Sequence, residues 1–100
     1  MIKHVVMMKL IQPGNKEDFH WNMLKLKSDL EELADKIPEL NSIEVGINIS
    51  TAPESYNMVL NCEFDNRDDL EKYRTHPDHL DVLKFFHQVV EKSIVIDYEV

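Results

Sequence analysis

The segment IEVGINISTAPESYNMVLNCEF, residues 43–64, contains two stretches in which apolar and polar residues alternate, with a loop between them. A period of two residues is typical of a β-strand that turns one face toward a core. No helical spacing separates the stretches, so two strands follow each other in the middle of the chain. The apolar residues predicted to share one side are Ile43, Val45, Ile47 and Ile49 in the first strand and Tyr56, Met58, Leu60, Cys62 and Phe64 in the second.

The residues before this pair predict a strand followed by a helix. Residues 2–11 alternate as a strand, and His4 shares one face with the apolar even positions. The sequence QPGN, residues 12–15, forms a loop. In residues 16–37 the apolar positions recur every three or four residues, which predicts a helix that Pro38 stops. The apolar stripe of this helix consists of Phe19, Met23, Leu26, Leu30, Leu33 and Ile37.

The residues after the pair predict a helical region broken in two. Asp65 is a plausible N-cap for a short helix that extends to about Tyr73. Thr75 or His76 then caps a second helix, whose first turn contains Pro77. Proline is tolerated there because the first turn of a helix has no intrahelical partner for that N–H group.

The last elements complete an α+β arrangement. The second of these helices runs to about Val90, and SIVIDYEV, residues 93–100, alternates as a strand with Ile94, Ile96, Tyr98 and Val100 on one side. The order β-α-β-β-α-β is that of a ferredoxin-like protomer, with a four-stranded antiparallel sheet and helices on one face. One hundred residues form a single domain, residues 1–100.

The second face of this sheet has a mixed composition, and two interpretations of it stay open. The face is solvated with scattered apolar residues, or two sheets pair face to face as a barrel-like homodimer. The residues assigned to this face are Val5, Met7, Val59 and Val95, which are apolar, and Glu44, Asn57, Asn61, Glu63 and Asp97, which are polar or charged.

Composition excludes several classes of function. Eleven basic residues against 19 acidic ones give a net charge of −8, which argues against nucleic-acid binding and against docking on anionic membranes. Because Cys62 is the single cysteine, an internal disulfide is excluded. Its position on the apolar face of a strand predicts a small core residue. Gly14 and Gly46 form no phosphate-binding loop, so no nucleotide cofactor is expected. The N-terminal apolar run is too short for a signal peptide or membrane span, which favours a cytoplasmic protein.

Two histidines from distant parts of the chain are predicted to point into the same interior space. On the helix after Pro77, His79 precedes Leu83 by four residues and therefore lies on the core-facing stripe. His4 lies on the apolar face of the first strand. Tyr73, at the end of the preceding short helix, is within reach of the same region.

A purely structural interpretation of these residues also stays open. A histidine on an apolar face is more often a hydrogen-bonded core group than a catalyst, and His76 before a proline is a natural helix cap. In this interpretation Tyr73 packs its ring and leaves its hydroxyl at solvent. His76 and His79 are three residues apart without an HExxH pattern, and no carboxylate is assigned to orient the imidazoles, so no metal site is expected.

Four segments together resemble the stress-responsive dimeric α/β-barrel (Dabb) family, over essentially the whole chain. They are IKHVV at residues 2–6, SIEVGINIS at residues 42–50, YRTHPDH at residues 73–79 and IDYEV at residues 96–100. The resemblance implies a ferredoxin-like protomer that pairs through its sheet face as a homodimer. In the olivetolic acid cyclase type of this family, which closes a linear polyketide thioester by aldol condensation, the matching positions imply that His4, Tyr73 and His79 act and that His76 supports them.

Two hypotheses for function follow from the residues and the resemblance. The first is a cofactor-independent enzyme that acts on a small carbonyl or polyketide-like compound, with His79 as the base and His4 and Tyr73 as polarising or positioning groups. The alternative is a non-catalytic stress-response or small-ligand-binding dimer, in which these residues form a structural hydrogen-bond network. Neither hypothesis requires a metal or an organic cofactor.

Overall fold

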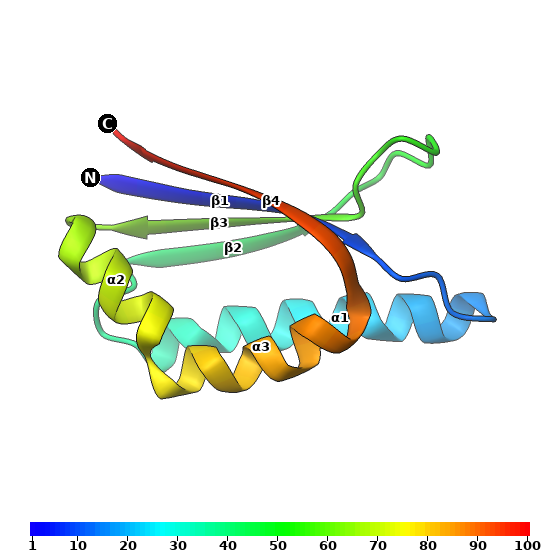
Figure 1. Ribbon diagram of the computed structural model, residues 1–100, viewed down its shortest axis with the longest axis horizontal. Helices are drawn as coiled ribbons and strands as arrows, with labels where there is room; N and C mark the ends of the chain where they lie inside the picture. Colours follow the sequence, from blue (N-terminus) through cyan, green and yellow to red (C-terminus); the bar gives the residue numbers. More distant parts are fainter.

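A computed structural model describes residues 1–100 as one sheet layer and one helix layer (Figure 1). The helices all cover the same face of the sheet, which confirms the predicted ferredoxin-like fold. Along the chain the elements are β1 (Ile2–Leu10), α1 (Lys16–Glu31), the 3-10 helix η1 (Glu32–Asp35), β2 (Ser42–Ile47), β3 (Met58–Phe64), α2 (Arg67–Thr75), α3 (Pro77–Val89) and β4 (Val90–Glu99).

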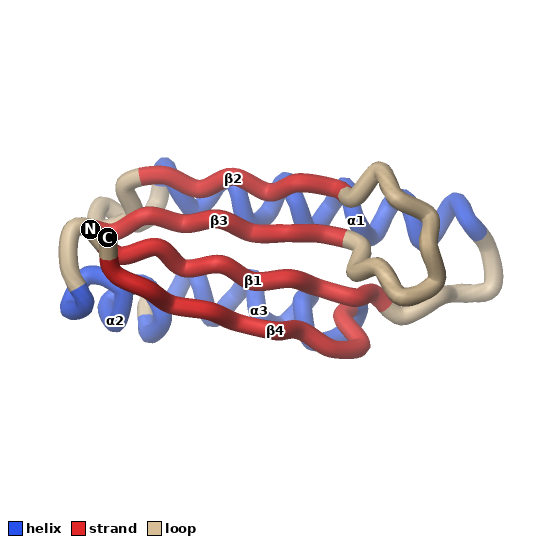
Figure 2. The backbone as a smooth tube through the Cα atoms, turned by 90° about the horizontal axis from the view of Figure 1, so that it is seen from above, coloured by secondary structure: helices blue, strands red, loops and turns tan.

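The sheet has the strand order β2-β3-β1-β4, and every neighbouring pair is antiparallel (Figure 2). The central strand β1 places His4 opposite Cys62 on β3 and opposite Asp97 on β4. Residues paired across strands point to the same face of the sheet. Cys62 and Asp97 therefore share the helix-covered face with His4.

The core lies between this face and the helices, and the predicted stripe of the first helix supplies much of it. Met23, Leu26 and Leu30 of α1 are buried, as are Leu33 and Ile37 after it. The α-helix itself ends at Glu31, where η1 follows, so the prediction of one helix to Ile37 was wrong in its end but right in its buried face.

The helix starts are fixed by side chains that accept backbone hydrogen bonds. Asn66, rather than the predicted Asp65, caps α2, because its Oδ1 accepts from the Asp69 N–H at 2.8 Å. His76 caps α3 through its Nδ1, which accepts from the Asp78 N–H at 3.1 Å. His76 was one of the two predicted caps, and its role here is structural.

The predicted strands on either side of residues 50–55 are shorter than their alternation suggests. β2 ends at Ile47, and Ile49 is fully exposed. Asn48 turns the chain, since its side-chain amide donates to the Tyr56 carbonyl at 2.7 Å and its Oδ1 accepts from the Ser50 N–H at 2.8 Å. Tyr56 lies before β3 and outside the core, against prediction.

In the last strand, β4, the side that was predicted to face away from the helices is the side that faces them. Val95 and Asp97 lie on the helix-covered side, because they pair with Val6 and His4 of β1. Ile94, Ile96 and Tyr98 lie on the outer face and are all exposed in the protomer. Alternation shows which residues share a face, but it does not show which face the helices cover.

The outer face of the sheet is therefore more apolar than the sequence indicated. Its apolar residues come from three adjacent strands, and charged residues remain at Lys3, Lys9, Glu44, Glu63 and Lys92. The apolar members of this outer face are Val5, Met7, Val59, Ile94, Ile96 and Tyr98.

Candidate functional site

A cavity of about 410 Å³ lies between the helix-covered face of the sheet and the helices. Six of its eleven lining residues are hydrophobic, and the other five are polar or charged. The hydrophobic residues are Val6, Leu30, Leu60, Leu83, Phe86 and Val95, and the polar ones are His4, Arg74, His79, Ser93 and Asp97. A mostly apolar cavity with a few convergent polar groups is the usual form of a small-molecule site.

His4 is held in this cavity by a carboxylate. Its side chain is 11% exposed, and its Nδ1 contacts Oδ1 of Asp97, the residue opposite it on β4. A carboxylate only accepts hydrogen bonds, so the His4 Nδ1 carries the proton and donates it. This arrangement fixes the tautomer and leaves Nε2 without a protein partner.

His79 reaches the same cavity from the first turns of α3. Its Nδ1 lies 3.1 Å from the Arg74 carbonyl oxygen and donates to it, so a neutral His79 has its lone pair on Nε2. Burial lowers the pKa of His79, the Arg74 carbonyl opposes that shift, and the charges of His4, Arg74 and His76 lower the pKa further. Near neutral pH the ring is a neutral base with one free nitrogen.

Tyr73 lies beneath the two imidazoles and does not line the cavity. Its ring centroid is 4.3 Å from that of His79 and 6.1 Å from that of His4. The side chain is fully buried, so the expectation of a solvent-exposed hydroxyl was wrong. Burial raises the pKa of Tyr73, which keeps the phenol protonated. The structure thus brings His4, Tyr73 and His79 into one cluster but opens only the two histidines to the cavity.

The Tyr73 hydroxyl is in contact with the only cysteine of the chain. The Cys62 Sγ donates toward it at 4.0 Å, and burial raises the pKa of the Cys62 thiol to about 12. A thiol that stays protonated is a poor nucleophile, which agrees with the prediction of a core residue. No group of three or more His, Cys, Asp or Glu side chains is placed to hold a metal ion.

The sequence interpretation missed Asp97, Arg74 and Ser93. Asp97 was assigned to the opposite face of the sheet, so no carboxylate was available to orient an imidazole. Its signal was present in the chain, because a register that pairs His4 with the last strand brings Asp97 beside it. Arg74 lies between Tyr73 and the predicted helix cap and carried no motif of its own.

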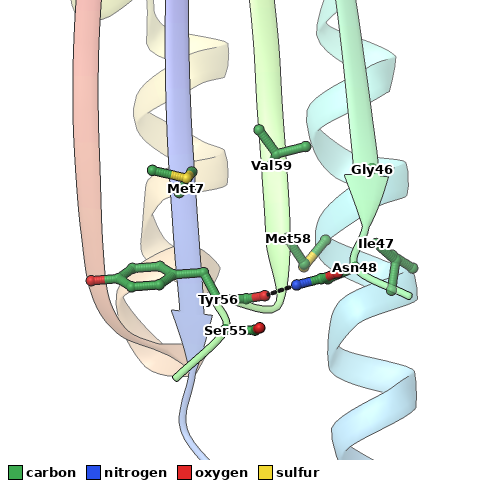
Figure 3. Close-up of a pocket in the computed structure, with 8 residues that line it drawn as sticks. All are labelled: Met7, Gly46, Ile47, Asn48, Ser55, Tyr56, Met58 and Val59. Atoms are coloured by element: carbon green, nitrogen blue, oxygen red, sulfur yellow. Dashed lines mark hydrogen bonds between the residues drawn. The ribbon is translucent and has the colours of Figure 1, made fainter. Parts of the chain in front are cut away.

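A second hollow, of about 320 Å³, lies on the outer face of the sheet (Figure 3). Met7, Gly46 and Val59 form its floor, and Tyr56 lies at its rim, with its ring across β1. None of the predicted site residues lines it. It lies on the face where the apolar residues are exposed, opposite the cavity that contains the histidines.

No helix of the chain combines the length and the apolar character that a membrane crossing requires.

Comparison with known proteins gives both a family and a fold. The family model described as "Stress responsive A/B Barrel Domain" matches residues 2–100. A dimeric protein of unknown function with a ferredoxin-like fold, from Bacteroides fragilis, is 36% identical, with a TM-score of 0.90 over 99% of this chain and 95% of that chain. No curated protein matches the sequence.

Two more distant solved structures share the fold. A Dabb family protein from Mesorhizobium loti is 24% identical, with a TM-score of 0.76 over 99% of this chain and 95% of that one. The hydroxynitrile lyase of Passiflora edulis is 16% identical, with a TM-score of 0.83 over 99% of this chain and 92% of that one. At least one protein with this architecture is thus an enzyme, whereas others have no known function.

Proposed function

The chain belongs to the stress responsive A/B barrel domain family, and on this premise we propose that it is a cofactor-independent enzyme that removes a proton beside a carbonyl group of a small substrate. One observation carries the proposal. Two imidazoles line one largely apolar cavity, and each has its Nδ1 fixed by an acceptor and its Nε2 free.

His79 is the proposed general base. Its lowered pKa keeps the ring neutral near neutral pH, and the Arg74 carbonyl fixes the tautomer that presents Nε2. A base in this state accepts a proton from a carbon between or beside carbonyl groups, a step to which a placed histidine contributes about 10²–10⁴-fold in rate.

His4 is the proposed group that stabilises the enolate oxygen. Asp97 accepts the hydrogen bond from its Nδ1 and orients the ring, and in the proposed step a protonated Nε2 donates to an oxygen that gains negative charge. Tyr73 has a positioning role in this proposal, because its buried ring packs on His79 and its hydroxyl lies outside the cavity lining. His76 supports the site by capping α3, the helix that carries His79.

The alternative is a non-catalytic protein that binds a small ligand in the same cavity. The burial of His4 and its contact with Asp97 favour it, since a paired histidine in a core is a common structural group. The two functions differ in one measurable step, the transfer of a proton from carbon.

We further propose a homodimer that forms through the outer face of the sheet. The related Bacteroides fragilis protein is dimeric, and the exposed apolar residues of this face are contiguous across β3, β1 and β4. An apolar surface of this kind on a monomer usually marks an interface.

Proton removal is measured directly by deuterium exchange. We expect the protein to accelerate exchange at the carbon between the carbonyls of 3-oxobutanoate or its methyl ester in D₂O, followed by proton NMR. His79→Gln is expected to lower this rate by about 100-fold or more, because it removes the base. His87→Gln, at an exposed position on the same helix, is the matched control and should leave the rate unchanged.

Binding of a probe without accelerated exchange would support the non-catalytic alternative. An unchanged rate in a folded His79→Gln variant would also contradict the role given to His79. Circular dichroism of each variant verifies that the fold is intact, so that a lost rate is not a lost structure.

A further inference from the structure

Arg74 is the only lysine or arginine among the residues that line the histidine cavity. The chain carries 11 basic and 19 acidic residues, so its overall field repels anions. An arginine at the wall of this cavity is therefore expected to pair with a carboxylate of the protein or with a ligand.

The guanidinium has no strong partner within the protein. Its nearest carboxylate is Glu71, one turn earlier on α2, with 4.0 Å between Nη1 and Oε2. Both side chains are more than half exposed, at 56% and 66%, so solvent screens this contact. The carboxylate of the cavity itself, Asp97, is engaged by His4. Arg74 is thus free to bind an external anion.

The same residue is also bonded to the proposed base through its backbone. The Arg74 carbonyl accepts the His79 Nδ1–H at 3.1 Å, and its guanidinium charge lowers the pKa of His79. Because both side chains line one cavity, a ligand anion on the guanidinium would occupy the same cavity as the His79 imidazole. Because the carbonyl belongs to the backbone, a substitution of the side chain keeps the hydrogen bond to His79.

We infer that Arg74 selects the substrate of this cavity by binding an anionic oxygen group, a carboxylate or a phosphate, at one end of a carbonyl compound. The inference rests on the proposed function for the identity of the carbonyl compound. The planar guanidinium matches such groups with paired hydrogen bonds, which neutral esters cannot form as well. Proton removal at His79 then occurs on a molecule held at its charged end.

The test compares charged and neutral substrates of the same shape. We expect Arg74→Gln to raise the KM for 3-oxobutanoate in the exchange reaction by about 10-fold to 100-fold, as for the loss of a charge-assisted hydrogen bond. The KM for methyl 3-oxobutanoate should stay within about twofold of the unsubstituted protein on the same ground. Arg74→Lys, which keeps the charge, should recover part of the affinity.

Arg67→Gln is the matched control. It removes the same charge from the same helix, at a side chain that is 82% exposed, contacts Glu99 and does not line this cavity. Its KM values should equal those of the unsubstituted protein. Equal losses for the acid and the ester in Arg74→Gln, or equal losses in the two arginine variants, would overturn the inference.

Thioesters distinguish the two sources of the anion. Exchange is compared for 3-oxobutanoyl-coenzyme A, which carries phosphates, and for the N-acetylcysteamine thioester, which carries none. If Arg74→Gln raises the KM for the coenzyme A ester but not for 3-oxobutanoate, phosphate is the bound group. If it raises the KM for 3-oxobutanoate but not for the coenzyme A ester, carboxylate is the bound group. A penalty on neither anion contradicts the inference.

An NMR titration of the His79 ring with the same compounds separates this inference from the proposed enzyme. Suppose that the acid binds at least about tenfold more tightly than the ester, that Arg74→Gln removes this difference, and that no exchange occurs. The anion site is then supported, and the proposed enzyme activity is contradicted. If exchange occurs and Arg74→Gln affects none of these compounds, 3-oxobutanoyl-coenzyme A included, then the proposed enzyme is supported and the anion site is contradicted.

Discussion

Burial and hydrogen bonding shift the pKa of His79 in opposite directions. Burial disfavours the charged ring and has the larger effect, so the pKa lies below its ordinary value although the Arg74 carbonyl favours the protonated form. His4 has instead a carboxylate against its Nδ1. Two imidazoles in one cavity thus have different surroundings, which is the condition for one to act as a base and the other as a donor.

The lowered pKa of His79 links the site to the stability of the fold. We expect the free energy of unfolding to fall as the pH decreases from about 7.5 to about 5.5, in part through His79. The unfolded chain, whose imidazole has its ordinary pKa of 6.5, binds a proton at a higher pH than the folded chain. The contribution is complete above that value and is lost as the pH falls toward the lowered pKa. Urea unfolding at the two pH values measures the loss.

The variant His79→Gln isolates this contribution. It is expected to lose less stability than the unsubstituted protein over the same pH interval, because glutamine does not titrate. His87→Gln, which changes an exposed histidine on the same helix, should show the full loss. An identical pH dependence in His79→Gln and the unsubstituted protein would mean that the imidazole titrates alike in the folded and unfolded states.

The edge strand β2 is tied to α1 by a pair of charged side chains. Glu31 accepts the Val45 N–H through Oε2 at 3.2 Å, and Lys27 donates to the Val45 carbonyl at 2.5 Å. Lys27 and Glu31 also contact each other, at 3.1 Å. Edge strands carry unpaired backbone groups that attract other chains, and here α1 occupies both groups of Val45.

Glu31→Ala is expected to lower the free energy of unfolding by about 1–2 kcal/mol, since it leaves the Val45 N–H without its partner. Asp29→Ala is the control, because Asp29 forms a similar i, i+4 pair with Lys25 on the same helix but bonds no strand. Its expected cost is about 0.3–0.5 kcal/mol. Chemical denaturation of both variants measures the difference. Equal costs would show that the contact to β2 contributes nothing.

The elements differ in how well their sequence specified them. α1 and β3 each follow one period throughout, so their buried faces were predicted residue by residue. In the same way, the period of β1 predicted that His4 points inward, and the period of α3 predicted this for His79. β4 is apolar on both sides, at Val95 as well as at Ile94 and Ile96. Periodicity alone therefore could not decide which side the helices cover, and Asp97 was placed on the wrong one.

Turn chemistry limited the prediction in the same way between β2 and β3. Ile49 and Tyr56 continue the alternation of their neighbours, but the Asn48 side chain bonds to the loop and turns the chain away from the sheet. The polar lining of the cavity could not be predicted either, since Arg74 comes from α2 and Ser93 and Asp97 come from β4, and these elements meet only in the folded chain. Periodicity predicted that both histidines point inward, the family resemblance implied a role for them, and only the fold shows which groups hold them.

At the scale of the molecule, the sheet has one face under the helices and one face exposed. Ile94, Ile96 and Tyr98 are 45%, 56% and 45% exposed, and the hollow of Figure 3 lies on the same side. The protomer is small, and a chain of this length buries a limited share of its surface alone. Pairing two such faces about a two-fold axis would bury them together and would leave each histidine cavity on its own side of the dimer.

The dimer proposal predicts a mass of two chains in solution at micromolar concentration, and it predicts which face controls that mass. Ile96→Glu is expected to raise the dimer dissociation constant by at least about 100-fold, because a two-fold interface would bury the unpaired carboxylate twice. Leu24→Glu, which changes a similarly exposed apolar residue on α1, should leave the dimer intact. Analytical ultracentrifugation over a range of concentrations measures both constants. A monomeric mass for the unsubstituted chain would contradict the proposal that the outer face is the interface. An equal rise of the dissociation constant in the two variants would contradict it as well.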